Sequence, residues 1–341
     1  MLPDNPKHLT QAKLRKIIRQ TRYNQNFSVR ESDKFDFTAI DEYARSAPDD
    51  VRSDAKTLSA YLIKPAKNDW EKIRAIYTWL ISHLEYDMRV YRGYRTPVDP
   101  GEVLRSGIAA CSGFSNLFGD LAKSAGLEAC NVPGYGKGYG YLENKEINTP
   151  NHEWNVVRID KKWHIFEATW GAGSVKNGMY YPTLDYYWFD TPPEEFIFTH
   201  LPQDPVWQLI TEPLLLIDFE KMPRLLSPYF RAGFSGQDAF SCLGPDLAFD
   251  FPVVYDTGTI NFQIIKSPMS GVLNQDEVYY FLIYAAGMND MMIKNGTSQI
   301  VVKPKNGYFA TLVTAEAGEL KICLPKPGSK RYLVLVKYKV N

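Results

Sequence analysis

Three residue types that together support acyl transfer occur in order along the 341-residue chain: a cysteine at position 111, a histidine at 152 and a glutamate at 167. Attack on an amide carbonyl needs a nucleophile that is readily ionised, a base that holds the proton, and a third group that orients the base. The sequence offers Cys111, His152 and Glu167 for these three roles.

Cys111 precedes a segment with helical periodicity. Phe114, Leu117, Phe118 and Leu121 recur at i, i+3, i+4 and i+7, and Gly126 is a typical helix stop. The cysteine is therefore expected in or just before the first turn, where unpaired backbone N–H groups and the helix dipole stabilise a thiolate. A packed, inert cysteine at a helix start would give the same pattern.

His152 and Glu167 fall on a predicted β-hairpin. Residues 152–159 alternate as a strand does, Asp160 and Lys161 can turn the chain, and residues 163–169 run back.

If Ile159 pairs with Lys162, His152 stands opposite Thr169 and Trp154 opposite Glu167. His152 and Glu167 would then share one face of the hairpin at a diagonal of roughly 7–8 Å. A slip of one residue would place them on opposite faces. An exposed strand-end histidine and an unrelated surface glutamate are the alternative interpretation.

The elements around these residues change from helical to β along the chain. Apolar positions from residue 68 to about 86 predict a helix, and short β-rich runs at near-regular spacing follow from about residue 239. We predict an N-terminal helical extension over residues 1–67, a core with a Pro- and aromatic-rich wrap over 68–235, and an Ig-like β-sandwich over 236–341.

Composition excludes several classes of protein. With 45% hydrophobic residues and 39 basic against 39 acidic side chains, the chain is globular and carries no net charge that would draw it to nucleic acid. Four scattered cysteines, Cys111, Cys130, Cys242 and Cys323, make neither a disulfide scaffold nor a metal cluster. We expect no metal and no cofactor.

The N-terminus is the one asymmetric region, because seven basic residues face a single aspartate across the first thirty positions. A basic helix is expected there, either solvated or laid on a membrane. The longest apolar stretch is too short to span a bilayer, so we expect no transmembrane segment. As the sequence stands, it predicts a cytoplasmic protein; if a leader was removed, the protein would be periplasmic or extracellular.

The sequence segments around the three residues resemble those of the transglutaminase-like superfamily of papain-type thiol enzymes, and in particular its kyphoscoliosis-peptidase-like branch. The resemblance covers about residues 68–215. Four blocks carry it: DWEKIRAIYTWLISHLEYD from Asp69, GIAACSGFSNLFGDLAKSAGLEACNVPGYGKG from Gly107, NHEWNVVRIDKKWHIFEATWGAG from Asn151, and DTPPEEFIFTHLPQDPVWQLI from Asp190.

The resemblance implies an α+β fold in which N-terminal helices pack on an antiparallel sheet, followed by the β-sandwich. It implies Cys111 as nucleophile, His152 as general base and then acid, and Glu167 at a position where the family usually has aspartate. The backbone N–H of Cys111 is the expected oxyanion donor. Trp154, Tyr135, Lys137 and Trp170 are candidates for lining the cleft, with a packed core as the alternative for the two tryptophans.

The expected function is cysteine-dependent acyl transfer on peptide or side-chain amides of a protein or peptide substrate, with hydrolysis favoured. Two alternatives stay open: a protein-glutamine transglutaminase, and an interaction module that kept the fold and lost the reaction. The C-terminal β domain is the expected docking surface for a protein partner.

Overall fold

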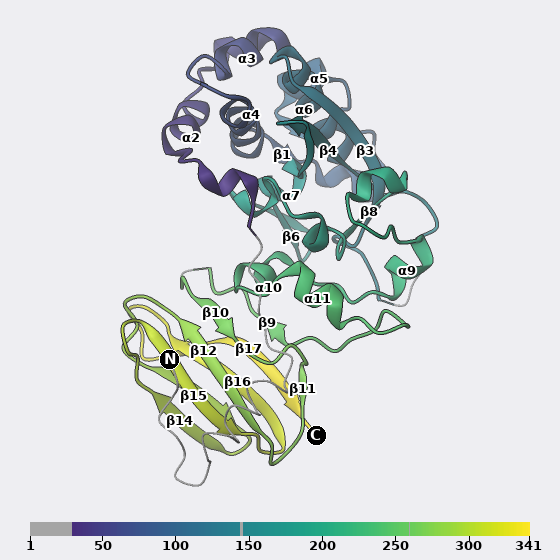
Figure 1. The fold of residues 1–341 in the computed structure, drawn as a ribbon. Helices are drawn as coiled ribbons and strands as arrows, with labels where there is room; N and C mark the ends of the chain where they lie inside the picture. The colour runs from purple at the N-terminus through teal and green to yellow at the C-terminus, as the bar shows by residue number, and fades with distance from the viewer. Residues whose placement is uncertain (1–28, 144–145, 259) are drawn as a thin grey trace. The chain divides into compact units, whose positions relative to one another are not determined.

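The computed structural model describes residues 29–143, 146–258 and 260–341 (Figure 1). The described chain packs as two compact units, residues 29–220 and residues 221–341. The predicted basic helix at the N-terminus lies outside the described residues.

The first unit contains a helical layer. Its helices are α2 (Thr38–Arg45), α3 (Ala55–Leu62), α4 (Asp69–His83), α5 (Pro100–Ser106), α6 (Cys111–Ser124), α7 (Ala168–Ala172) and α8 (Pro193–Phe196), and α9 (Leu216–Lys221) lies at the unit boundary. Helix α6 packs against α3, α4 and α5. The predicted helix from residue 68 is confirmed as α4. It begins at Asp69 because the Asn68 side chain caps it by accepting from the Glu71 N–H.

A four-stranded antiparallel sheet lies against α6, with strand order β5-β4-β3-β8. Figure 1 shows β3 and β4 beside this helix. The strands are β3 (Glu128–Gly136), β4 (His152–Ile159), β5 (Lys162–Phe166) and β8 (His200–Pro202). Two smaller pairs complete the unit: β1 (Glu85–Tyr86) parallel to β2 (Ile108–Ala109), and β6 (Gly173–Lys176) antiparallel to β7 (Met179–Pro182).

The β4–β5 hairpin has the predicted register. Ile159 pairs with Lys162, and the turn residues Asp160 and Lys161 both have positive φ angles, 49° and 67°. Two left-handed residues in a two-residue loop are the pattern of a type I′ turn, whose twist matches that of the strands. The hairpin prediction is therefore confirmed.

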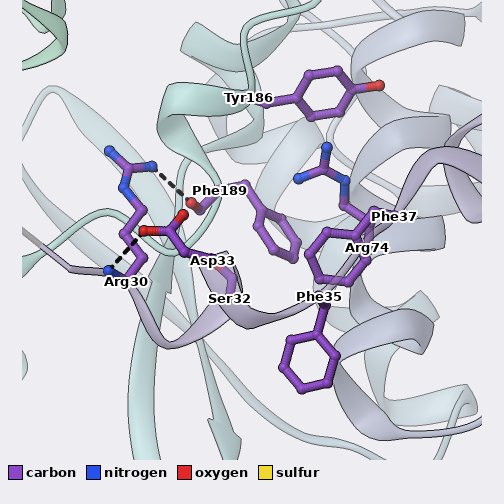
Figure 2. A pocket seen from close by; sticks show the side chains of 8 residues that line it. All are labelled: Arg30, Ser32, Asp33, Phe35, Phe37, Arg74, Tyr186 and Phe189. Atoms are coloured by element: carbon purple, nitrogen blue, oxygen red, sulfur yellow. Dashed lines mark hydrogen bonds between the residues drawn. The ribbon is translucent and has the colours of Figure 1, made fainter. Parts of the chain in front are cut away.

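Residues 29–67 pack onto the core rather than forming a separate extension. A buried ion pair explains this: Arg74 of α4 donates from Nε and Nη2 to the two carboxylate oxygens of Asp41 of α2, at 2.7 and 2.8 Å. Figure 2 shows the Arg74 guanidinium among aromatic rings, and it lies 4.8 Å from the Phe37 centroid and 3.9 Å from that of Tyr186. Such contacts fix the N-terminal segment to α4.

Arg74 and the two aromatic residues Phe37 and Tyr186 also line a pocket, which Figure 2 shows from close by. The lining residues are Arg30, Ser32, Asp33, Phe35, Phe37, Arg74, Tyr186 and Phe189. None of them is a predicted catalytic residue, so this pocket is distinct from the candidate active site described below.

The second unit contains short helices followed by strands. The helices are α10 (Ser227–Arg231) and α11 (Gly236–Cys242), and the strands are β9 (Val253–Val254), β10 (Gln263–Lys266), β11 (Val272–Leu273), β12 (Val278–Tyr284), β13 (Met291–Asn295), β14 (Ser298–Val302), β15 (Tyr308–Thr314), β16 (Gly318–Pro325) and β17 (Tyr332–Val340).

Two sheets make up this β region. One has the order β10-β12-β15, and the other β11-β17-β16-β13-β14 with β9 also paired to β17. Phe281 of the first sheet and Tyr338 of the second are buried and meet edge to face, 5.8 Å between ring centroids. The sheets thus share one core, as the predicted β-sandwich requires.

In the part of the chain that the structure describes, no helix combines the length and apolar character needed to cross a bilayer.

Candidate active site

Cys111 is the first residue of α6, as predicted. The N-cap residue is Ala110, whose methyl side chain cannot accept a hydrogen bond from the first-turn N–H groups. Gly113 fixes the start of the helix, because a Cβ there would lie 2.4 Å from the Pro97 carbonyl oxygen and 2.7 Å from the Ala109 Cβ. The partly exposed thiol is thus held at a helix end whose backbone donors have no side-chain cap.

His152 and Glu167 make a direct hydrogen bond. His152 Nε2 lies 2.8 Å from Glu167 Oε2, and the two side chains are 10% and 0% exposed. A buried carboxylate against one ring nitrogen fixes the orientation and the tautomer of an imidazole. Since Nε2 is engaged by Glu167, Nδ1 is the nitrogen left for a second partner.

Cys111 lies close enough to the His152 ring to affect its pKa. Burial is the largest single influence on the ring and lowers its pKa. The charge of Glu167 and the nearby Cys111 side chain act in the other direction, and together they raise the pKa of His152 to about 10. The imidazole is therefore charged at neutral pH and gives a Cys111 thiolate a positive neighbour.

Glu167 does two tasks with its two oxygens. While Oε2 engages His152, Oε1 accepts the backbone N–H of Trp170 at 3.1 Å, so that Glu167 is the N-cap of α7. The strand β5 consequently ends at Phe166, and the predicted pairing of His152 with Thr169 is wrong because Thr169 lies in α7. The capped helix fixes the carboxylate at the end of the hairpin.

Gly136 makes room for the histidine. A Cβ at this position would lie 3.0 Å from the His152 Cβ and 3.3 Å from its Cγ. The glycine belongs to the GYGKG sequence of β3, next to the strand that carries His152. Its absent side chain lets the imidazole lie against the sheet backbone.

A second histidine, His200, approaches the same carboxylate. Its Nε2 lies 3.7 Å from Glu167 Oε2, the side chain is fully buried, and no other partner for this nitrogen exists among the described residues. Burial lowers the pKa of His200 well below its ordinary value, and the charge of His152 lowers it further. His200 is thus a neutral ring packed at 4.0 Å on Phe196.

The sequence analysis did not single out His200, although it lies in the last of the four family-like blocks. Together with His152 and Glu167 it forms a group whose ligand atoms lie within 4.8 Å of one another, a set that could hold a metal ion. In the present arrangement, His152 and Glu167 use those atoms for their mutual hydrogen bond.

Of the four cleft candidates, the structure brings two to His152. The ring centroids of Trp170 and Trp154 lie 5.7 and 6.1 Å from that of His152. Trp154 is only 1% exposed, whereas Trp170 is partly exposed and is the one able to face a bound substrate.

Tyr135 and Lys137 are placed elsewhere. His152 pairs with Gly134 across the sheet, so Tyr135 points to the opposite face by strand alternation. The Lys137 ammonium is buried and donates to the carbonyl of Phe219 in α9 at 2.6 Å, which anchors this helix. Neither side chain reaches the His152 ring.

Comparison with known proteins places this site within one family. Residues 56–168 match the model of the transglutaminase-like superfamily, a range that includes Cys111, His152 and Glu167.

Among curated relatives, the chain is 31% identical over 214 residues to the Homo sapiens kyphoscoliosis peptidase, covering 62% of this chain and 31% of the relative. It is 28% identical over 222 residues to Hillarin of Drosophila melanogaster, covering 59% of this chain and 26% of that protein. A solved structure described as a TGase matches with 20% identity and a TM-score of 0.27, covering 47% of this chain and 38% of the other.

The chain spans about a third or less of the length of these curated relatives. The family model and the curated relatives indicate the same family, and the matched range contains Cys111, His152 and Glu167 in that order along the chain. Residues 56–168 are thus a transglutaminase-like superfamily domain, and the chain carrying it is related to the kyphoscoliosis-peptidase-like branch.

Proposed function

We propose that this chain catalyses cysteine-dependent acyl transfer on peptide or side-chain amides, with water as the usual acceptor. The observation that carries the proposal is the grouping of Cys111, His152 and Glu167, in which a buried carboxylate holds the imidazole and Cys111 lies close enough to raise the pKa of the same ring. Membership of the transglutaminase-like superfamily supports the same reaction class.

The first half-reaction starts from a Cys111 thiolate paired with the His152 imidazolium. Sγ attacks the carbonyl carbon of the amide, and the carbonyl oxygen takes up the negative charge as the C–S bond forms. The imidazolium then donates its proton to the departing amine as the C–N bond breaks, which leaves a thioester on Cys111 and a neutral His152. Glu167 keeps the ring oriented through both steps.

The negative oxygen of the intermediate needs hydrogen-bond donors already in place. The first-turn N–H groups of α6 fit this role, because Ala110 gives them no side-chain acceptor and the helix dipole favours an anion there. The backbone N–H of Cys111 is the donor nearest to the reacting sulfur along the chain.

The second half-reaction returns the cysteine. Neutral His152 removes a proton from water, the resulting hydroxide attacks the thioester carbon, and the C–S bond breaks to give a carboxylic acid and the thiolate. A primary amine in place of water would give a new amide, which is the transglutaminase outcome.

Two assays on the same protein separate these outcomes. Fluorescein-labelled casein reports hydrolysis, and incorporation of dansylcadaverine into N,N-dimethylcasein reports amine transfer. The proposal predicts release of labelled fragments that is lost in Cys111→Ala and retained in Cys130→Ala, a matched change at the other partly exposed cysteine. Amine incorporation that depends on Cys111 would favour the transglutaminase reaction. If the natively folded protein shows neither activity, that result would favour the interaction module.

A further inference from the structure

Four tyrosines from separate segments form a continuous row of ring contacts. The centroids of Tyr180 (β7) and Tyr86 (β1) are 6.4 Å apart, and those of Tyr86 and Tyr91, in the 3-10 helix η3 (Met88–Arg92), are 6.0 Å apart. Tyr91 and Tyr139 meet edge to face at 5.3 Å and 78°. We call Tyr86, Tyr91, Tyr139 and Tyr180 the tyrosine platform.

Tyr86 connects the tyrosine platform to the segment that carries Cys111. Strand β1 pairs Tyr86 with Ala109 of β2, and the chain reaches Cys111 two residues later. Burial raises the pKa of Tyr86 and of Tyr91, and the negative charge of a Cys111 thiolate raises both further. The two phenols are therefore within electrostatic range of the sulfur and stay protonated at neutral pH.

The outer end of the tyrosine platform faces solvent. Tyr91 is 48% exposed and Tyr139 is 46% exposed, although each ring already contacts another. Exposed aromatic rings that touch one another present apolar faces with hydroxyl groups at the edge, which is the usual composition of a ligand-binding surface. No member of the row is a charged side chain, so the surface suits an uncharged, apolar group.

A substrate attacked by Cys111 would bring its own side chains near this surface. When Sγ contacts the carbonyl carbon under attack, the side chains of the flanking residues lie within one or two residue lengths, about 3.3–3.6 Å each, of the sulfur. Strand pairing places Tyr86 of the tyrosine platform beside Ala109, two residues before Cys111. The occupant of the tyrosine platform is thus most directly a side chain of the substrate itself.

We propose that the tyrosine platform is a specificity subsite that binds an aromatic side chain next to the amide attacked by Cys111. The inference rests on the proposed function, since it assigns a substrate preference to the same nucleophile. Aromatic rings prefer offset or edge-to-face partners at 4.5–7 Å, and the tilted row of tyrosines offers both faces and edges to such a partner.

Alkylation of Cys111 tests the subsite without a known substrate. The rate constants for iodoacetamide and for N-benzyl iodoacetamide are measured at Cys111 by mass spectrometry, with N-acetylcysteine as the reference thiol. We expect the benzyl reagent to be favoured at Cys111 by about tenfold more than at N-acetylcysteine. We expect Tyr91→Ser combined with Tyr139→Ser to remove most of this preference, which is a ratio of two rate constants and so cancels any change in the reactivity of the thiol itself.

Two variants control for folding and for general aromatic loss. Tyr91→Phe keeps the ring and should keep the preference for the benzyl reagent. Tyr61→Ser removes a ring from another tyrosine pair of the same unit, on α3, which contacts α6 through the bond from Ser59 Oγ to the Leu121 carbonyl near the far end of that helix. It should change neither rate.

The possible results distinguish a failure of the proposed subsite from a failure of the proposed function. A benzyl preference equal to that of N-acetylcysteine, or one that survives the double substitution, overturns the subsite but leaves the proposed function intact if His152 still governs the iodoacetamide rate. A Cys111 that reacts with neither reagent faster than the reference thiol contradicts the proposed function and removes the basis of the subsite with it.

Discussion

His152 Nε2 and Glu167 Oε2 form a 2.8 Å hydrogen bond between two buried side chains from the two ends of one hairpin. The strand β4 begins at His152, and Glu167 directly follows the last residue of β5. The resemblance implies an aspartate at this position, and the longer glutamate reaches the ring while also capping α7 by accepting from the Trp170 N–H. The acid is therefore both a part of the site and a part of the fold.

Removing the charge of Glu167 should leave the His152 ring without a group that fixes its orientation and tautomer. We expect Glu167→Gln to lower the rate of casein hydrolysis by about 100-fold, because an amide neither stabilises the imidazolium nor fixes one tautomer. Glu167→Asp keeps the charge, but its carboxylate is one methylene short of the ring, so an intermediate rate is expected. Equal rates for the wild type and Glu167→Gln would contradict an orienting role for the carboxylate.

The charged imidazole should also make the free energy of unfolding depend on pH. The folded-state pKa of His152, about 10, exceeds the ordinary value of about 6.5, so protonation favours the folded state. This contribution is complete below about pH 6.5 and is lost as the pH rises through about 10. The free energy of unfolding of the wild type, minus that of His152→Gln, should accordingly decrease over this range in urea titrations.

His83 provides the control for this pH dependence. Burial lowers the pKa of His83, so its contribution has the opposite sign and is lost only as the pH falls below about 6.5. The difference between wild type and His83→Gln should therefore stay flat from about pH 6.5 to 10. A flat profile for the His152→Gln difference as well would show that His152 is not held in its charged form.

Even a methyl side chain at position 136 should lower the activity. A methyl group at this position would meet the His152 Cβ at 3.0 Å and must displace the ring by a few tenths of an ångström. We expect Gly136→Ala to slow casein hydrolysis by about tenfold or more, since misplacement of a catalytic group by a small distance has large kinetic effects. Gly101→Ala is the control, because its methyl would meet only the side chains of Asp99 and Arg105, at 3.1 and 3.3 Å.

The ion pair between Asp41 and Arg74 tests whether the N-terminal segment folds with the core. Removal of one partner leaves a buried charge unpaired, which typically costs about 3–5 kcal/mol. We expect Arg74→Leu to lower the free energy of unfolding by about that amount, and the double variant Asp41→Leu, Arg74→Leu to recover part of it. A change below about 1 kcal/mol in Arg74→Leu would mean that residues 29–67 do not fold with the core.

The sequence predicted the parts of the site that depend on local patterns. The helix that begins at Cys111 follows from its apolar spacing, and the turn at Asp160 and Lys161 fixed the hairpin register correctly. The end of that hairpin was missed, because the hydrogen bond from the Trp170 N–H to the Glu167 carboxylate caps a helix where strand periodicity suggested continuation to Thr169. Local periodicity does not reveal such a competing cap.

Contacts between distant segments could not be predicted from patterns. His200 lies in a Pro- and aromatic-rich stretch and reaches Glu167 only because β8 pairs with β3. The short strand at Glu85 and Tyr86 follows α4 without a break in the apolar pattern, so the predicted helix extended over it.

The most direct test of the central claim is the pH dependence of iodoacetamide alkylation at each of the four free cysteines, followed by mass spectrometry. Cys242 and Cys323 are buried, and burial raises the pKa of Cys323, so both serve as slow internal references. An unperturbed thiol ionises near about pH 8.5. We predict that at about pH 6 Cys111 reacts at least about tenfold faster than Cys130, and that His152→Ala removes this advantage without changing the rate at Cys130. Uniformly slow reaction of all four thiols below about pH 8, or a Cys111 rate that is indifferent to His152→Ala, would contradict the account.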